Sequence, residues 1–364
     1  MPPEHIRAFA PGRVNLIGEH TDYNQGLALP FAISQGITVS AHALSRDAPD
    51  RGRVYAYARD LDERDEFALT APEPTSGWRA FVRGTVAELE RAGFPLAGAS
   101  LEFGGQLPSG AGLSSSAALE VALCLALIEL GARAATVHDS QHDGGGLREL
   151  QRIDIARLCA RVENDWVGAH TGLLDQLASL YGAPDAALCI DFRTLDIQPV
   201  PLLLGDWTLV VLDSGEQHQL ASSGYNQRRA ECAHACQLLG VDSLRDADHA
   251  EVQALPEPLR RRALHVIDEN DRVHQSVIAL RDGDLHAMGL LLNASHRSLR
   301  DNYEVSTPAV EATAQRLRDA GASGARLVGG GFGGSVLGLF APGSNPPADA
   351  HEVRPGPGAH LLDG

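Results

Sequence analysis

Chemically versatile side chains are concentrated between Gly12 and Tyr23. The run GRVNLIGEHTDY places a guanidinium, two carboxylates, an imidazole and hydroxyl groups in one short stretch bounded by glycines. A polyhydroxylated ligand requires such a mixture, because each buried hydroxyl must find a donor or an acceptor. A turn held together by salt bridges is the alternative interpretation, but such a turn does not require this variety. The stretch therefore predicts a site for a ligand rich in hydroxyl groups.

A run of glycines and serines, LPSGAGLSSSA, leads from Leu107 into an almost wholly apolar stretch between Ala117 and Leu130. Glycines let backbone N–H groups turn inward, serines add hydroxyl donors, and the first turn of a helix supplies positive potential. The alternative is a helix N-cap with spare serines. The combination predicts an anion-binding loop that needs no lysine.

The segment ENDWVGAHTGLLDQ begins at Glu163 and ends in the pair Asp175-Gln176. A helix is expected to run into a turn bounded by glycines, after which apolar residues flank Asp175. Partial burial of this carboxylate suits a general base, whereas a helix cap is the default role of an isolated Asp.

The segment GGGFGGS, at residues 329–335, formally satisfies the pattern G-x-G-x-x-G. The strand-like SVLGLF follows it where a dinucleotide-binding fingerprint requires a helix, so that fingerprint is excluded. The glycines instead predict a backbone loop that closely approaches a ligand or another loop.

Composition excludes several other functions. All 30 basic residues are arginine, so a Walker A loop, the strand lysine of protein kinases, Schiff-base chemistry and Ser-x-x-Lys hydrolases are excluded. The net charge of −17 opposes broad binding to nucleic acid or to an anionic membrane. Five scattered cysteines argue against a disulfide framework, and no leader or apolar span is recognisable. These features predict a reduced, cytoplasmic protein.

The elements that must position these segments indicate an α+β protein of two domains. Residues 6–70 alternate short β-like runs with turns and predict an antiparallel sheet, followed by a helix that Ser76 caps. A strand is expected at 99–105, and the apolar helix at 117–130 is expected to be buried on all sides. Pro199 and Pro201 mark the expected joint, which divides the chain into domains 1–198 and 199–364.

Taken together and in this order, the segments resemble those of the galactokinases, within the superfamily of small-molecule kinases that includes homoserine and mevalonate kinases. GRVNLIGEHTDY is similar to the galactokinase signature, and GAGLSSSAALEVA to the ATP loop of the superfamily. VGAHTGLLDQ resembles the segment of the catalytic Asp, GYNQRRAEC a sugar-contacting segment, and SHRSLRDNYEVSTPA and VGGGFGGS the C-terminal motifs. The resemblance covers roughly residues 6–340 and implies a two-domain small-molecule kinase fold with mixed or antiparallel sheets and helices, whose active site lies between the domains.

The resemblance also implies a role for each residue of the site. Asp175 would accept the proton of the anomeric hydroxyl of galactose, assisted by Arg13. The sugar hydroxyls would be bound by Glu19, His20, Thr21, Asp22 and Tyr225. The ATP phosphates would be bound by Gly110, Ala111, Gly112, Leu113, Ser114, Ser115 and Ser116. Mg²⁺, a hard cation that prefers oxygen ligands, would be held by Ser116 and Glu163. The expected partners are galactose and ATP, with neither nucleic acid nor membrane, and the expected state is a monomer.

Three departures from the family pattern are visible. The loop Thr136–Gly146 is longer than usual, and His170-Thr171 stands where relatives often carry Cys. After Phe340 a helix usual between the last two strands is missing, which puts C-terminal packing in doubt. A kinase for another sugar, such as N-acetylgalactosamine or arabinose, and a non-catalytic sensor of galactose and ATP are the alternative functions. Ser116-Ala117 is intact, whereas such sensors are altered after the serines of the loop.

Overall fold

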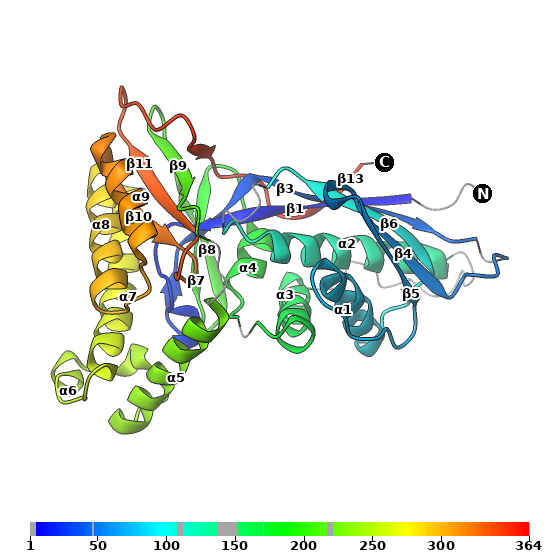
Figure 1. Cartoon of the computed structure of the whole chain (residues 1–364), viewed down its shortest axis with the longest axis horizontal. Helices are drawn as coiled ribbons and strands as arrows, with labels where there is room; N and C mark the ends of the chain where they lie inside the picture. Colours follow the sequence, from blue (N-terminus) through cyan, green and yellow to red (C-terminus); the bar gives the residue numbers. More distant parts are fainter. Residues whose placement is uncertain are drawn as a thin grey trace.

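The computed structural model describes residues 5–45, 47–107, 112–136, 151–169, 171–216 and 221–363. The elements form two halves (Figure 1). One half is a large sheet with helices beneath one face, and the other is a smaller sheet with the long later helices beside it. The predicted α+β architecture is therefore present.

The first sheet has six strands in the order β13-β1-β3-β6-β4-β5. Its neighbours are antiparallel except β4 and β6, which are parallel. A buried face of small and branched residues alternates with a polar face along β4 and β6, as a half-buried sheet requires. The strands are β1 (His5–Asn15), β3 (Pro30–Ala43), β4 (Arg53–Ala58), β5 (Glu63–Ala68), β6 (Ala99–Gly105) and β13 (His360–Leu362).

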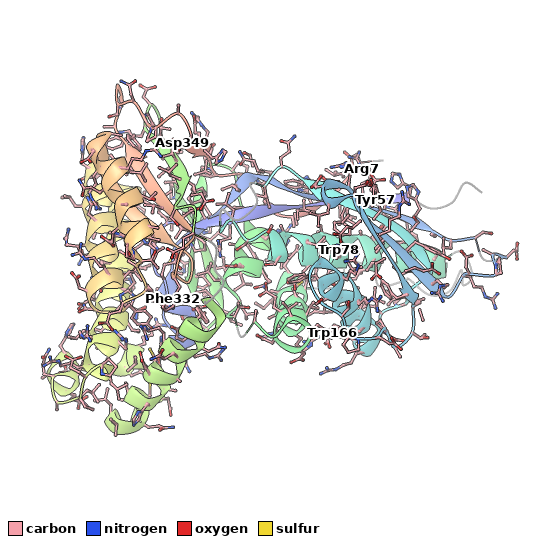
Figure 2. All side chains as sticks on the ribbon, viewed as in Figure 1. Arg7, Tyr57, Trp78, Trp166, Phe332 and Asp349 are labelled. Atoms are coloured by element: carbon pink, nitrogen blue, oxygen red, sulfur yellow. The ribbon has the colours of Figure 1, made fainter. Side chains whose placement is uncertain are left out.

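Four helices cover the buried face of this sheet (Figure 1). They are α1 (Trp78–Arg91), α2 (Ser115–Thr136), α3 (Arg152–Arg161) and α4 (Leu174–Tyr181), and a π-helical turn, η3 (Val162–Val167), continues α3. Trp78 and Trp166 lie among these helices and pack against the core (Figure 2). The predicted cap of α1 is wrong, because Gly77, at φ 63°, occupies the N-cap and no side chain caps the helix.

Helix α2 is the core of the first half. Within the described residues it is the one helix long and apolar enough to cross a membrane, over Ser115–Ala135, but 83% of its apolar window is buried inside the protein. The prediction that this helix is buried on all sides is confirmed. Its apolar surface serves packing against β1 and β3.

The second half is built on a four-stranded sheet in the order β10-β11-β9-β12, all antiparallel. Helices α8 and α9 pack on it, and α7 packs on α8 and α5. Its elements are β9 (Thr208–Asp213), α5 (Ala221–Leu239), α6 (His249–Val252), α7 (Leu259–Arg281), α8 (Leu285–Asp301), α9 (Pro308–Asp319), β10 (Ala322–Val328), β11 (Ser335–Phe340) and β12 (His351–Val353).

A three-stranded sheet, β2-β7-β8, lies between the two halves (Figure 1). It consists of β2 (Leu27–Ala28), β7 (Ala186–Asp191) and β8 (Asp196–Pro201). Pro199 and Pro201, the expected joint between the domains, both lie in β8. They are tolerated because β8 is an edge strand, where a missing N–H costs no ladder hydrogen bond.

The C-terminal segment crosses from the second half to the first. After Phe340 the described chain forms no helix, and β12 adds to β9 while β13 adds to β1. Between the two strands, Gly358 donates its N–H to the carbonyl of Gly182, and Ala359 donates to that of Ser179. The segment thus ties the end of α4 to the first sheet, in place of the missing helix.

Candidate active site

Arg13 and Asp175 form the centre of the site. The Nε of Arg13 donates to Oδ1 of Asp175 at 2.6 Å and its Nη2 to Oδ2 at 2.7 Å, although the residues are 162 positions apart. The remaining Nη1 donates to the carbonyl of Gly112 at 2.8 Å. Burial disfavours the charged guanidinium, but Asp175 outweighs burial and raises the pKa of Arg13. The pair is a bidentate ion pair held at the edge of the glycine- and serine-rich loop that precedes α2.

Backbone geometry brings the pair together. An irregularity in β1 between Pro11 and Arg13 directs Arg13 off the strand register. Gly12 lies so close to the loop that a Cβ there would stand 2.5 Å from the carbonyl oxygen of Leu113. Asp175 lies in the first turn of α4, and Ser114, held at φ 56°, donates its hydroxyl to the carboxylate. The Asp175 side chain keeps 25% of its surface exposed, so it can still accept a hydrogen bond from a ligand.

Glu163 lies on the π-helical turn η3, close to the first residues of α2. Its Oε1 accepts from the hydroxyl of Ser116 at 3.1 Å, and its Oε2 accepts from Thr171 at 2.5 Å and from Gln176 at 3.0 Å. Burial, and then the charge of Asp175, raise the pKa of Glu163, and the three donors partly offset that rise. A nearby cation would favour the charged form further.

Glu120 is a feature that the sequence analysis missed. It is fully buried on α2, one turn after Ser116, and neither carboxylate oxygen has a hydrogen-bond partner in the described part of the chain. Burial, followed by the charge of Glu163, raises the pKa of Glu120 well above its usual range and so favours its neutral form. Glu120 could have been found from the sequence, because it is the single charged residue in the apolar run AALEVALCLAL. A charged residue in a buried helix requires a reason.

Residues Glu19–Asp22 form a turn, which we call the EHTD turn, and two of its side chains point toward the second half of the protein. Oε1 of Glu19 accepts the N–H of Gly329 at 2.8 Å and lies 2.7 Å from Nη2 of the fully buried Arg326. His20 is held at φ 64°, and its Nδ1 lies 2.9 Å from the hydroxyl of Tyr23. Burial, followed by the charges of His265 and Arg228, lowers the pKa of His20 well below its usual value, so the ring is neutral.

Thr21 and Asp22 differ in role. The hydroxyl of Thr21 is fully buried and within hydrogen-bond distance of the carbonyls of Gly18 and Leu27, at 2.9 and 2.7 Å. This geometry assigns Thr21 to the turn itself rather than to a ligand. The carboxylate of Asp22 lies against Gly172, where a Cβ would stand 1.9 Å from Oδ2. Burial, with Asp175 and Glu19 nearby, raises the pKa of Asp22 to about 6.

Tyr225 and the glycine-rich loop close the site from the second half. The ring of Tyr225, on α5, lies against Gly330 and 5.3 Å from the ring of His20. Burial, followed by the charges of Asp22 and Asp175, raises the pKa of Tyr225 well above its usual value. Tyr225, Asp22, Glu19 and Asp175 are therefore close enough to interact, although they come from distant parts of the chain.

The glycine-rich loop packs against other loops, as predicted. The N–H of Phe332 donates to the carbonyl of Val305 at 2.7 Å, and that of Gly334 donates to Glu216 at 3.1 Å. A Cβ on Gly331 would stand 2.5 Å from Cβ of Val305. Close contacts leave no room for a side chain at Gly331 and Gly333, whereas Gly329 has open space but adopts φ 85°.

Among the predicted site residues, Leu113 takes part through its backbone carbonyl only, and others lie outside the residues that the structure describes. Leu113 is a core side chain whose carbonyl accepts from the backbone N–H of Arg13 at 3.1 Å. Gly110, Ala111 and His170 lie outside the described residues, as does almost all of the loop Thr136–Gly146. All five cysteines are free thiols, and the described residues contain no group of three or more His, Cys, Asp or Glu side chains that could hold a metal ion.

Comparisons with known proteins agree with this geometry. The galactokinase galactose-binding signature matches residues 2–43, and the N- and C-terminal domains of GHMP kinases match residues 80–183 and 276–356. A galactokinase of Mycobacterium bovis is 42% identical over 338 residues, which cover 91% of this chain and 87% of the relative. The chain belongs to the galactokinase family. A galactokinase of Thermotoga neapolitana is 38% identical over 340 residues, covering 93% of this chain and 90% of the relative.

Solved structures confirm the predicted fold. The galactokinase of Lactococcus lactis complexed with galactose superimposes with a TM-score of 0.83 at 30% identity, covering 99% of this chain and 95% of that one. The mevalonate kinase of Methanococcus jannaschii has a TM-score of 0.66 at 15% identity, covering 98% and 99%, and shows the shared fold alone. The family resemblance, the two-domain kinase fold and the enzyme class predicted from sequence are all confirmed.

Proposed function

We propose that this member of the galactokinase family transfers the γ-phosphoryl group of ATP to the anomeric hydroxyl of α-D-galactose, with Asp175 as the base. The products are galactose 1-phosphate and ADP, which places the enzyme in galactose metabolism. The Arg13–Asp175 ion pair is the observation that carries the assignment. Arg13 also binds the carbonyl of Gly112 in the glycine- and serine-rich loop, and Asp175 lies close enough to Asp22 to contribute to the raised pKa of that carboxyl.

The geometry suits Asp175 as the acceptor of the hydroxyl proton. Arg13 binds both carboxylate oxygens and Ser114 donates to Oδ2, so the carboxylate is fixed in orientation while part of it stays accessible. Phosphoryl transfer depends mainly on positioning and on neutralising charge, both of which this pair supplies. The guanidinium also lies where negative charge develops, without any lysine.

On the sugar side, we assign hydroxyl binding to Glu19, His20, Asp22 and Tyr225. Neutral His20 has an Nε2 that is buried and has no partner among the described residues, so it can serve a ligand hydroxyl. Carboxylates that accept hydroxyl hydrogens are typical of sugar sites, because each buried hydroxyl needs a partner. Thr21, also expected to contact the sugar, instead holds the turn that carries these groups.

Asp22→Ala is expected to weaken galactose binding by about 1–3 kcal/mol, because a sugar hydroxyl would lose its acceptor. The KM for galactose should rise accordingly, while the KM for ATP stays near that of the wild type. Initial rates at varied galactose and at varied ATP measure both. An unchanged galactose KM in a folded variant would remove Asp22 from the sugar site.

ATP phosphates are assigned to the loop from Gly110 to Ser116, where the N-terminus of α2 and the exposed hydroxyl of Ser115 would supply donors. The residues present fit Mg²⁺: Ser116 and Glu163 place a hydroxyl and a buried carboxylate together, and Mg²⁺ usually takes one or two protein oxygens plus phosphate oxygens. When bound, Mg²⁺ would neutralise charge on the phosphates. Thr171 and Gln176 would keep the Glu163 carboxylate oriented.

Glu163→Gln is expected to raise the Mg²⁺ concentration needed for half-maximal activity and to leave galactose binding intact. An amide keeps the shape of the side chain but is a far weaker ligand for a hard divalent cation. A Mg²⁺ titration of activity, together with calorimetric binding of galactose, separates the two effects. An unaltered titration would show that Glu163 does not contact the metal.

ADP release with ATP, Mg²⁺ and a panel of free sugars tests the function itself. Turnover of galactose in preference to N-acetylgalactosamine and arabinose is expected. Faster turnover of either of those sugars would favour a related sugar kinase. Binding of galactose and ATP without ADP release would instead identify a sensor. A cytoplasmic monomer without nucleic-acid or membrane partners remains our expectation, and light scattering of the purified chain tests the oligomeric state.

A further inference from the structure

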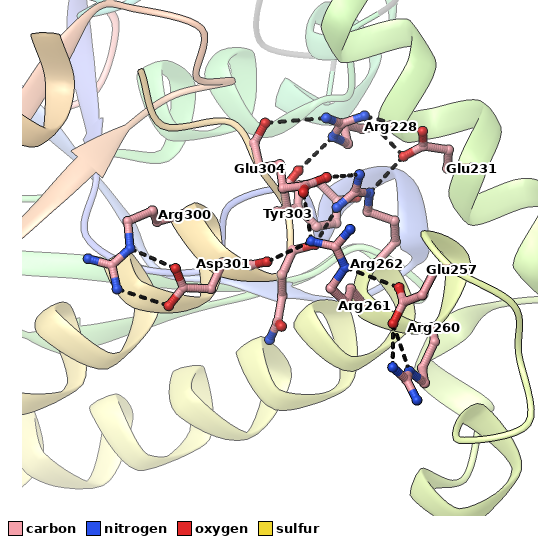
Figure 3. A network of polar contacts seen from close by, with 11 residues as sticks. Arg228, Glu231, Glu257, Arg260, Arg261, Arg262, Arg300, Asp301, Tyr303 and Glu304 are labelled. Carbon is pink, nitrogen blue, oxygen red and sulfur yellow. Dashed lines mark hydrogen bonds and ion pairs between the residues drawn. The ribbon is translucent and has the colours of Figure 1, made fainter. Parts of the chain in front are cut away.

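A network of charged side chains surrounds the loop that follows α8, and two of its arginines, Arg228 and Arg262, are buried (Figure 3). We call residues 302–305 the α8 loop. Arg262, on α7, donates to the carbonyl of Asn302 at 2.5 Å. Arg228, on α5, donates to the carbonyls of Tyr303 at 2.6 Å and Glu304 at 3.2 Å. Two arginines from different helices thus bind three successive carbonyls of one loop.

Two carboxylates hold these arginines in place. Glu231 lies between them and accepts from Nη1 of Arg228 at 3.0 Å and from Nε of Arg262 at 2.7 Å. Glu304 accepts from Nη2 of Arg262 at 2.5 Å. Glu304 itself adopts φ 55°, a left-handed conformation that is unfavourable for a residue other than glycine. The ion pairs therefore hold the loop in a conformation it would not readily adopt alone.

Stability alone does not account for this arrangement. The Arg262 side chain is 2% exposed and that of Arg228 is 8% exposed. Removing two guanidinium groups from water costs free energy that buried ion pairs only roughly offset. A function that requires an exact loop position is the better explanation.

The α8 loop contacts the sugar-binding side at two points. The ring of Tyr303 lies 4.6 Å from that of His20, and its hydroxyl lies 2.8 Å from that of Tyr23, the partner of His20. One residue later, the carbonyl of Val305 accepts the N–H of Phe332 from the glycine-rich loop. That loop in turn binds Glu19 through Gly329.

We propose that Arg262 and Arg228 are positioning residues for galactose recognition, acting through the α8 loop on His20 and on the glycine-rich loop. Neither arginine has to touch the sugar. The inference rests on the proposed function, because it assumes that Glu19 and His20 bind galactose. It adds that the sugar site is held in shape from the second half of the protein.

Arg262→Lys tests the proposal, because an ammonium keeps the charge but cannot bind Glu231, Asn302 and Glu304 in a fixed plane. The KM for galactose is expected to rise about tenfold, the effect of losing one charge-assisted hydrogen bond. The KM for ATP and kcat should stay within about twofold, since the loop does not contact the phosphate side. Arg260→Lys is the matched control: it lies on the same helix, but its side chain is 41% exposed and binds Glu257 rather than the α8 loop.

Glu304→Gln and a double variant complete the design. Glu304→Gln leaves both arginines in place and changes a side chain that is 42% exposed, so it is expected to disturb folding little and to raise the galactose KM in the same direction. Arg262→Lys combined with Tyr303→Phe should cost less than the product of the two single effects, because both act through one loop. Calorimetric titration of galactose without ATP provides a readout independent of turnover.

Equal rises of both KM values in Arg262→Lys, or an unchanged galactose KM in both Arg262→Lys and Glu304→Gln, would overturn the inference. The same galactose KM in Arg260→Lys as in Arg262→Lys would also overturn it. Failure of the proposed function is distinguishable, because it would appear in the wild type as absent galactose turnover. If the wild type does not bind galactose, both the proposed function and the positioning role of the arginines would be overturned.

Discussion

Asp175→Asn is expected to lower kcat by roughly 10²–10⁴, the usual contribution of a positioned acid or base. The amide keeps the shape of the carboxylate but cannot accept the proton of the anomeric hydroxyl. Galactose binding should change little, because the proposed sugar contacts are Glu19, His20, Asp22 and Tyr225. Single-turnover rates and calorimetric binding of galactose measure the two quantities. Turnover close to that of the wild type would contradict the assignment of Asp175 as base.

Arg13→Leu is expected to lower kcat as well, and the double variant should lose much less than the product of the two single losses. The bidentate contact, at 2.6 and 2.7 Å, makes the two side chains one unit: without Arg13 the carboxylate is no longer oriented, and without Asp175 the guanidinium is unpaired. The measurement is a double-mutant cycle: kcat is determined for the wild type, Asp175→Asn, Arg13→Leu and the double variant at saturating ATP and galactose. Multiplicative losses would show that the residues act separately.

Glu269→Ala is expected to destabilise the protein by about 3–5 kcal/mol, the cost of breaking a buried ion pair and leaving its partners unpaired. Glu269, on α7, is fully buried and accepts from Arg272 at 2.6 Å, from Ser295 at 2.6 Å and from the backbone N–H of Gly18 at 3.0 Å. Glu269 therefore joins the second half of the protein directly to Gly18, the residue before the EHTD turn. Denaturant unfolding measures the loss, and Glu352→Ala, whose ion pair is with the exposed Arg354, is the control.

The effect of Glu269→Ala should depend on pH. Burial disfavours the carboxylate, but Arg272, His265 and Arg326 outweigh burial and lower the pKa of Glu269 from 4.5 to about 2. A carboxyl group with a lowered pKa in the folded state stabilises the protein above its unfolded pKa and loses that contribution as the pH falls toward the folded one. The difference in unfolding free energy between wild type and variant should therefore shrink between pH 4.5 and pH 2. A difference that stays constant over this range would contradict the ion pair.

Local sequence was enough to identify the chemical groups of the site and most elements that carry them. Short β-like runs predicted β1, β3, β4 and β6 of the first sheet but not β13, which joins the sheet from the far end of the chain. The apolar run after the serines predicted α2, because periodicity and burial are properties of a single segment. The glycine-rich loop was recognised as a close backbone contact for the same reason: glycine is required where a Cβ would collide. The resemblance then assigned roles to Asp175 and Arg13.

Only the tertiary structure decided which of these groups meet and which merely hold the fold. It placed Thr21 in the turn, Pro199 and Pro201 in an edge strand, and the C-terminal segment across both halves. It also showed that Glu120 is fully buried and that Arg262 binds the α8 loop. A side chain's partner is set by long-range packing, and the free energy of a buried charge depends on that partner rather than on its neighbours in sequence.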